Sequence, residues 1–221
     1  MNNLKFKCAI FDLDGTLLYT LKSINKAINE TLEIFGYPTH PLENTVNLVN
    51  YGSIELVRRA LPEGRKDNAE VMRVHEVYCP ILKKYASDGT RPYDGIAETC
   101  RKLKDAGILL CVMSNKPQAA TESCIETYFE KDLFDVVRGF VPGEFKKPDK
   151  KFTYDVMRQA GVSHEDCVLI GDSVVDLDTA KNAQCPCIWV KWGYSNADNI
   201  GGIPEFTAET PSDIEKIILG I

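Results

Sequence analysis

The stretch CAIFDLDGTLL, residues 8–18, begins with four apolar residues and then places two aspartates, Asp12 and Asp14, before Gly-Thr. A short apolar run that ends at turn residues predicts a buried β-strand. Charge at the end of a buried strand is costly unless a partner compensates it. The two carboxylates therefore indicate a site where a cation or a substrate offsets their charge.

Four further runs rich in apolar and β-branched residues follow, and helix-like segments separate them. These runs are ILLCVM (108–113), DVVRGF (135–140), CVLIG (167–171) and PCIWVKW (186–192). This alternation predicts an α/β fold, a parallel sheet with helices on both faces. Two of the predicted helices end at Gly107 and Gly161, and the last, 211–219, has Ser212 and Glu215 at capping-box spacing.

Between the first and second strands lie roughly ninety residues without a predicted strand, too many for a simple crossover helix. Apolar residues in 21–35 recur at steps of three and four, which is typical of an amphipathic helix. Two more apolar stripes follow, and Pro80 is expected to kink or break the last helix. We therefore expect an inserted small α-helical cap domain at 17–88, with 1–16 and 89–221 forming the core.

Composition argues against several classes of protein. The 221 residues are 44% hydrophobic and carry a net charge of −6 with both signs interspersed, which disfavours nucleic acid and anionic membranes as partners. The apolar runs are too short to span a membrane, and the N-terminus lacks a signal-peptide core. The eight cysteines form no C-x-x-C pair and no Cys/His cluster. We expect a cytoplasmic protein with reduced thiols, either a monomer or a homodimer.

Polar side chains follow several of the predicted strands. Because the carboxyl ends of parallel strands meet at one edge of a sheet, these residues are expected to converge there. They are Ser114, Asn115 and Lys116, then Asp172, Ser173 and Asp176, and the lysine-rich stretch 146–151. Clustered carboxylates repel one another unless a cation joins them, and an all-oxygen site with few protein ligands suits Mg²⁺. A lysine and a hydroxyl beside that metal point to phosphoryl transfer.

Four segments resemble, in order and spacing, the motifs of the haloacid dehalogenase-like hydrolase superfamily. They are DLDGT (12–16), SNK (114–116), KKP (146–148) and GDSVVD (171–176). The segments around them are most similar to the phosphoglycolate phosphatase branch. The resemblance implies a Rossmann-like core with a helical cap. It also implies a Mg²⁺-dependent phosphomonoester hydrolase that forms an aspartyl-phosphate and acts on a small phosphorylated metabolite.

The resemblance also implies a role for each motif residue. Asp12 would be the nucleophile, and Asp14 would protonate the leaving alcohol and then activate water. The Asp12 carboxylate, the Asp14 backbone carbonyl and Asp172 would hold Mg²⁺. The substrate would be bound by Thr16, Ser114, Asn115, Gly52 and the catalytic Lys147, with Asp176 and Ser173 supporting the metal site or the lysine.

Some positions have competing interpretations. Lys147 stands in a basic run, and is preferred over its neighbours because it precedes proline as in the family motif. Asp176 is also a candidate N-cap of the helix that follows it. Arg58 and Arg59 are candidates for contact with a substrate carboxylate, although such a pair is more often a solvated helix face. The loop 48–55, which contains Gly52, is the expected specificity element.

Two residues depart from the family pattern. Tyr19 replaces an acidic residue near the cap linker, and a change in hinge geometry or substrate access is expected from it. Gln184 stands where relatives usually have glycine, and we expect it to alter a helix terminus.

The substrate itself is left open by the sequence. The same architecture serves pyrophosphatases, sugar-phosphate and nucleotide phosphatases, and β-phosphoglucomutase-like phosphotransferases. A non-catalytic phosphate-sensing protein is a further alternative. Asp14 argues against it, because a pure binding protein has no need of a general acid.

Overall fold

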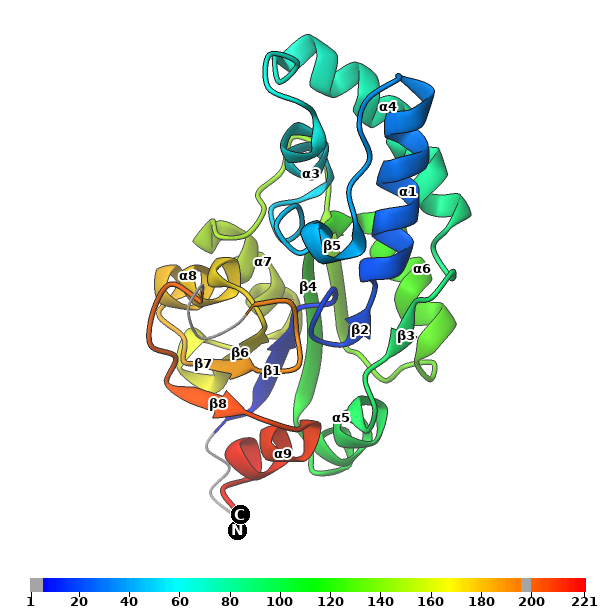
Figure 1. The fold of residues 1–221 in the computed structure, drawn as a ribbon. Coiled ribbons are helices and arrows are strands. Elements are labelled where there is room, and N and C mark those ends of the chain that lie inside the picture. The colour runs from blue at the N-terminus through cyan, green and yellow to red at the C-terminus, as the bar shows by residue number, and fades with distance from the viewer. Residues whose placement is uncertain (1–5, 196–199) are drawn as a thin grey trace.

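The computed structural model describes residues 6–195 and 200–221, and a six-stranded sheet forms its centre (Figure 1). The strands are β1 (Cys8–Phe11), β4 (Leu109–Pro117), β5 (Val136–Phe140), β6 (Cys167–Gly171), β7 (Cys187–Val190) and β8 (Phe206–Ala208). Their order is β5-β4-β1-β6-β7-β8, and every neighbouring pair is parallel. The α/β prediction and its five strands are confirmed. The three-residue β8 was not predicted, because so short a run carries little periodicity.

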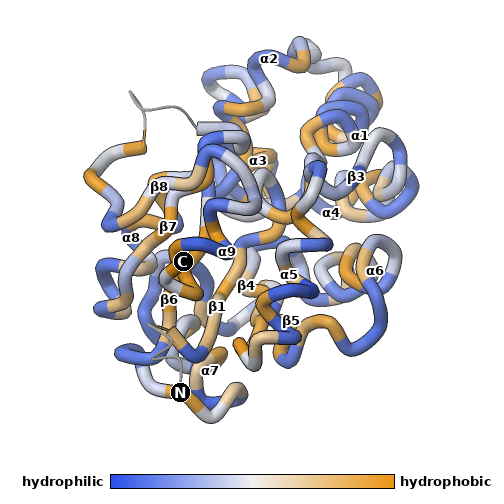
Figure 2. Tube along the Cα trace, turned by 90° about the horizontal axis from the view of Figure 1, so that it is seen from below, coloured by the Kyte–Doolittle hydropathy of each residue, from blue (hydrophilic) through white to orange (hydrophobic). Residues whose placement is uncertain are grey.

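Helices cover both faces of this sheet, and β1 contributes alternate side chains to each face. Ala9 and Phe11 pack into one hydrophobic cluster, and Cys8 and Ile10 pack into the other. The first cluster lies under α5 (Ile96–Asp105), α6 (Gln118–Tyr128) and α9 (Pro211–Leu219), and the second under α7 (Lys150–Ala160) and α8 (Val174–Ala183). A short 3₁₀ turn, His164–Asp166, precedes β6. Figure 2 shows the apolar strands running between these more polar helices.

A separate group of helices, here called the helical unit (residues 21–84), lies over the carboxyl ends of the strands (Figure 1). It comprises α1 (Leu21–Ile34), α2 (Leu42–Thr45), α3 (Ser53–Ala60) and α4 (Asn68–Lys84). These helices pack around their own hydrophobic cluster, which includes Ile28, Val57 and Tyr78. No helix in the described ranges is both long and apolar enough to cross a bilayer.

Of the kink or break expected at Pro80, the break does not occur. Helix α4 continues through this residue to Lys84. Tyr78 and Leu82, on either side of Pro80, are both buried in the cluster of the helical unit. Their packing holds both halves of the helix in place although one backbone hydrogen bond is missing.

Two short strands connect the helical unit to the core. Strand β2 (Leu18–Tyr19) pairs antiparallel with β3 (Arg91–Pro92). The Tyr19 ring makes edge-on contacts with Tyr93 and Tyr194, at centroid distances of 6.4 and 6.3 Å. The residue that departs from the family pattern is therefore part of an aromatic cluster at the two linkers.

The N-terminal cap of α9 differs from the predicted one. The capping box is formed by Thr210 and Asp213, not by Ser212 and Glu215. Pro211 occupies the first turn, where its missing N–H costs nothing, and the cap lies two residues before the predicted one, at Thr210.

Candidate active site

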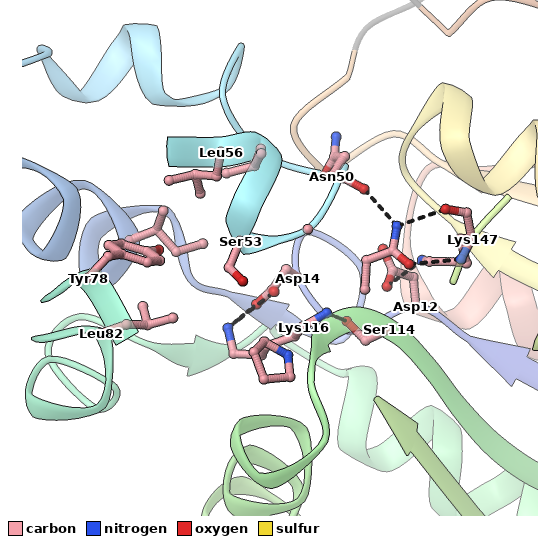
Figure 3. Close-up of a pocket in the computed structure, with 15 residues that line it drawn as sticks. Asp12, Asp14, Asn50, Ser53, Leu56, Tyr78, Leu82, Ser114, Lys116 and Lys147 are labelled. Atoms are coloured by element: carbon pink, nitrogen blue, oxygen red, sulfur yellow. Dashed lines mark hydrogen bonds and ion pairs between the residues drawn. The ribbon is translucent and has the colours of Figure 1, made fainter. Parts of the chain in front are cut away.

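Asp12 lies directly after β1, at the carboxyl edge of the sheet. Its backbone N–H donates to the Ile170 carbonyl at 2.8 Å, which fixes the end of β1 against β6. Because β1 lies between β4 and β6, residues at the carboxyl ends of all three strands meet around Asp12, and Ser114 and Lys116 belong to the last part of β4 itself. The convergence predicted from the strand ends is therefore observed (Figure 3).

Lys147 is the nearest cation to Asp12. Its Nζ lies 2.7 Å from Asp12 Oδ1 and 2.7 Å from Asp176 Oδ1, and its side chain is 3% exposed. Burial alone would lower the pKa of Lys147, but the charges of Asp12 and Asp176 outweigh it and raise the pKa. The ammonium group is therefore held in its charged form between two carboxylates.

Asn115 fixes the backbone of Lys147. Its Oδ1 accepts the Lys147 N–H at 2.8 Å, and its Nδ2 donates to the Lys147 carbonyl at 3.1 Å. Nδ2 also donates to the Asn50 carbonyl in the helical unit at 3.2 Å. The amide thus joins the lysine loop to the helical unit, in addition to lining the same cavity.

Three buried carboxylates form a compact group beside this lysine. Oxygens of Asp12, Asp172 and Asp176 all lie within 4.8 Å of one another. Burial raises the pKa of Asp12 to about 7, although the Lys147 charge opposes it. Burial, followed by the charges of Asp176 and Asp12, raises the pKa of Asp172 well above its usual range. Such a group is unfavourable unless a cation joins it.

Asp172 is oriented by polar groups from two segments. Its Oδ1 accepts the Thr16 hydroxyl at 3.2 Å, and its Oδ2 accepts the Tyr194 N–H at 2.7 Å. Thr16 is fully buried, so its hydroxyl faces Asp172 and is not part of the cavity lining. A Cβ at Gly15 would stand 2.5 Å from Asp172 Oδ2, so only glycine lets the backbone approach this closely.

Asp176 belongs to the capping box of α8, but it is not the N-cap considered from the sequence. Ser173 is the N-cap, and Asp176 Oδ2 accepts both the Ser173 N–H at 3.0 Å and the Ser173 hydroxyl at 2.6 Å. Its other oxygen, Oδ1, faces Lys147. One carboxylate therefore both caps a helix and positions the catalytic candidate.

Asp14 has a cationic partner that was not among the predicted site residues. Lys116 Nζ lies 3.0 and 3.1 Å from the two Asp14 oxygens. The Lys116 side chain is only 8% exposed; burial would lower its pKa, but the Asp14 charge raises it. The sequence placed Lys116 at a strand end, but the pairing depends on the irregular end of β4, whose register shifts between Met113 and Pro117.

A cavity lies between these groups and the helical unit. Its polar lining includes Asp12, Asp14, Asn50, Ser53, Ser114, Asn115, Lys116 and Lys147. Figure 3 shows how the labelled members of this group face one another. Gly52 lines it as well, and a Cβ there would lie 3.4 Å from the Asn115 carbonyl. The predicted loop therefore forms part of the cavity wall.

The arginines considered for a substrate carboxylate do not line this cavity. Both Arg58 and Arg59 form ion pairs with Glu55, and Arg59 also stacks 3.7 Å from the centroid of the Tyr51 ring. Of the two interpretations of this pair, the structure favours the helix face, because both arginines lie along the side of α3 and are engaged by local partners.

The charges of the site suit a divalent cation. Four carboxylates (Asp12, Asp14, Asp172 and Asp176) face two ammonium groups (Lys116 and Lys147). Four minus two leaves two negative charges uncompensated if every carboxyl is ionised. Buried carboxylate oxygens without a His or Cys among them are the ligands of hard cations such as Mg²⁺.

The chain is similar to known proteins in sequence and in fold. The model of a family described as haloacid dehalogenase-like hydrolase matches residues 9–190. A phosphoglycolate phosphatase of Agrobacterium fabrum is 30% identical over 95% of this chain and 93% of its own, and one of Aquifex aeolicus is 29% identical over 95% of both. A crystal structure from Lactobacillus delbrueckii subsp. bulgaricus, of a protein provisionally named phosphoglycolate phosphatase, is 30% identical. It covers 99% of this chain and 100% of its own, with a TM-score of 0.91.

Proposed function

The chain belongs to the haloacid dehalogenase-like hydrolase family and is a phosphatase, and on that premise we propose that it hydrolyses small phosphomonoesters through a covalent intermediate on Asp12. The observation that carries this proposal is the placement of two differently paired aspartates in one cavity. Asp12 is paired with Lys147, and Asp14 with Lys116. Different partners suit the two residues to different tasks.

Asp12 is the proposed nucleophile. Attack by its carboxylate on phosphorus would expel the alcohol and leave an aspartyl-phosphate, which water then hydrolyses. Lys147 and Ser114 line the cavity beside it and are proposed to bind the phosphoryl oxygens, whose charge must be stabilised during transfer.

Asp14 is the proposed general acid and base. Its carboxylate lies on the lining of the cavity with Ser53 and Leu56 of the helical unit, where the leaving group of a bound ester would stand. Donation of a proton to the leaving oxygen, and later removal of one from water, need a carboxyl at this place.

Asp12, Asp172 and the backbone carbonyl of Asp14 are the proposed ligands of Mg²⁺, with Asp176 beside them. When bound, the metal would neutralise the carboxylates and the phosphoryl charge. Thr16 and Ser173 hold Asp172 and Asp176 in position through the hydrogen bonds described above.

The helical unit is proposed to act as the cap. Residues 17–88 would form this domain, and 1–16 with 89–221 would form the core. The cap supplies one wall of the cavity, so it would exclude water and select the leaving group.

The eight cysteines are free and seven are buried, which agrees with a reducing, cytoplasmic setting.

A small phosphorylated acid such as 2-phosphoglycolate is the proposed substrate, because the curated relatives carry that activity in their names. The test is Mg²⁺-dependent phosphate release from a panel of small phosphomonoesters. Asp12→Asn should abolish turnover, because the amide cannot attack phosphorus. Borohydride treatment of the quenched wild-type reaction should convert residue 12 to homoserine, detectable by peptide mass.

Two results would contradict the proposal. Turnover that persists in Asp12→Asn would remove the nucleophile from the mechanism. Return of the phosphoryl group to a sugar phosphate instead of water would identify a phosphotransferase.

A further inference from the structure

The cavity contains a second cationic side chain, Lys116, to which the proposed reaction gives no role. Lys147 lies beside the nucleophile, whereas Lys116 lies with Asp14 near the helical unit. Arg58 and Arg59 are excluded from the lining, so Lys116 is the cation available to the leaving-group side within the described lining. Its side chain is about nine-tenths buried, and a buried ammonium interacts strongly with an anion because little water screens it.

Lys116 retains capacity for a further ligand. An ammonium group has three N–H donors, and among the described residues both of its hydrogen bonds go to Asp14. Figure 3 shows its Nζ directed into the cavity.

Ser53 provides a second polar group at the same place. Its hydroxyl points toward Asp14 and Lys116 in Figure 3, and its oxygen lies 2.8 Å from His75 Nε2. Burial lowers the pKa of His75 and so disfavours the charged form of the ring. When Nε2 carries the proton and donates it to Ser53, the Ser53 hydroxyl is free to donate to an anion.

Apolar side chains close the space beyond these two groups. They are Ile24, Val49, Leu56 and Leu82, and the ring of Tyr78 stands beside them. All five are buried, and Tyr78 is 1% exposed. A leaving group that reaches Lys116 must therefore be short, and a long polar one would lose its hydration against this wall.

We propose that Lys116 and Ser53 form a subsite for a carboxylate on the leaving group of a short phosphomonoester. This inference rests on the proposed phosphatase function and assigns the residues that recognise the carboxylate of the proposed substrate. The carboxylate accepts from the third donor of Lys116 and from the Ser53 hydroxyl, while the phosphoryl group lies at Asp12 and Lys147.

Binding tests the subsite without turnover. The probes are 2-phosphoglycolate and 2-hydroxyethyl phosphate, which have the same length and differ in the carboxylate. Titration calorimetry with Mg²⁺ and Asp12→Asn protein should show about 10- to 100-fold tighter binding of phosphoglycolate, the range for a hydrogen bond to a charged group. Adding Lys116→Met to this protein should bring the affinities for the two probes close to each other. Adding Arg58→Met should leave the ratio of the two affinities unchanged.

Ser53→Ala provides a second variant in case Lys116→Met does not fold. It should reduce the same ratio by about 5-fold, the value of one hydrogen bond. Equal affinity of the Asp12→Asn protein for both probes would overturn the subsite. So would an equal loss of both affinities in Lys116→Met, which would show that the lysine acts only through Asp14.

Values of kcat/KM for the two esters distinguish failure of the subsite from failure of the proposed phosphatase function. In the otherwise wild-type enzyme, Lys116→Met should lower kcat/KM for phosphoglycolate by at least about 10-fold more than for hydroxyethyl phosphate. A wild-type enzyme that hydrolyses neither ester contradicts the proposed function, while the binding ratios still decide the subsite.

Discussion

At the scale of single residues, the site depends on close approach of backbone to side chain. The backbone at Gly15 has φ +87°, and a Cβ there would stand 2.5 Å from a carboxylate oxygen of Asp172. Gly143 also has φ +87°, but nothing lies within 4 Å of its would-be Cβ. A side chain at Gly143 would therefore add backbone strain alone, whereas a side chain at Gly15 would add the same strain and also displace Asp172, a proposed metal ligand.

Gly15→Ala should therefore be more harmful than Gly143→Ala. Left-handed backbone costs a non-glycine residue about 1–2 kcal/mol, so this loss of unfolding free energy is expected for Gly143→Ala, with normal activity. Gly15→Ala should lose more than that and should also weaken Mg²⁺ binding at least about 10-fold, because Asp172 must move. Urea unfolding and Mg²⁺ titration measure the two effects. Equal stability and equal Mg²⁺ affinity in the two variants would contradict the role given to Gly15.

At the scale of secondary-structure elements, the helix ends show how local chemistry fixes the boundaries. Helix α8 ends at Ala183, and its C-cap, Gln184, has a φ of 58° and a ψ of 36°, which lie in the left-handed region. Glycine adopts this conformation without the steric cost that a Cβ imposes. The departure from the family pattern at this position therefore leaves the helix terminus in place and adds strain to it.

Gln184→Gly should stabilise the protein. The gain in unfolding free energy is expected to be about 1 kcal/mol, because the strained side chain is removed from an exposed C-cap. Thermal unfolding should show a midpoint about 2–4 °C higher, with unchanged phosphatase activity. A lower midpoint would mean that the Gln184 side chain makes a stabilising interaction in solution.

The start of α9 offers a matched pair of cap variants. Thr210→Ala should lower the unfolding free energy by about 1 kcal/mol, because the Thr210 hydroxyl and Asp213 form the capping box. Ser212→Ala should change it by less than about 0.5 kcal/mol, since Ser212 lies inside the helix. Chemical denaturation distinguishes them, and the reverse order would restore the cap position predicted from sequence.

Much of the fold was predictable because its signals are local. The apolar runs that became β1, β4, β5, β6 and β7 were each readable from a few residues, and their alternation with helices determined the parallel sheet. The pair β2 and β3 was missed because each strand has two residues, and the capping box of α9 because two overlapping spacings were present. The carboxylate cluster was predictable because strand ends converge, whereas the pairing of Lys116 with Asp14 depends on the three-dimensional path of a strand end.

At the scale of the whole molecule, the buried carboxylates link stability to pH and to metal. Burial raises the pKa of Asp12 to about 7 from an ordinary value of 3.8, and raises that of Asp172 as well. Between pH 3.8 and about pH 7, the folded protein keeps a proton on Asp12 that the unfolded chain has already released. The folded state therefore loses stability as pH rises through this window.

Metal-free protein should become less stable between pH 5 and pH 8. The slope contributed by each proton is at most about 1.4 kcal/mol per pH unit. Mg²⁺ at pH 8 should restore stability, because it binds only the folded carboxylate group. Urea unfolding with and without Mg²⁺ measures this, and Asp12→Asn should flatten the pH dependence. A metal-free protein that gains stability over this range would contradict the account.

The antiparallel pairing of β2 with β3 bears on whether the segment inserted between these two strands can be exchanged for another. Leu18 faces Pro92 and Tyr19 faces Arg91, so the chain leaves the core and returns to it at adjacent points. Strands in this register can be joined by a two-residue turn. An insertion of any length is then compatible with the same strand order in the core. We therefore expect the helical unit to be a replaceable module: a different one spliced between these two strands should alter which esters are admitted while the carboxylates of the core stay in place.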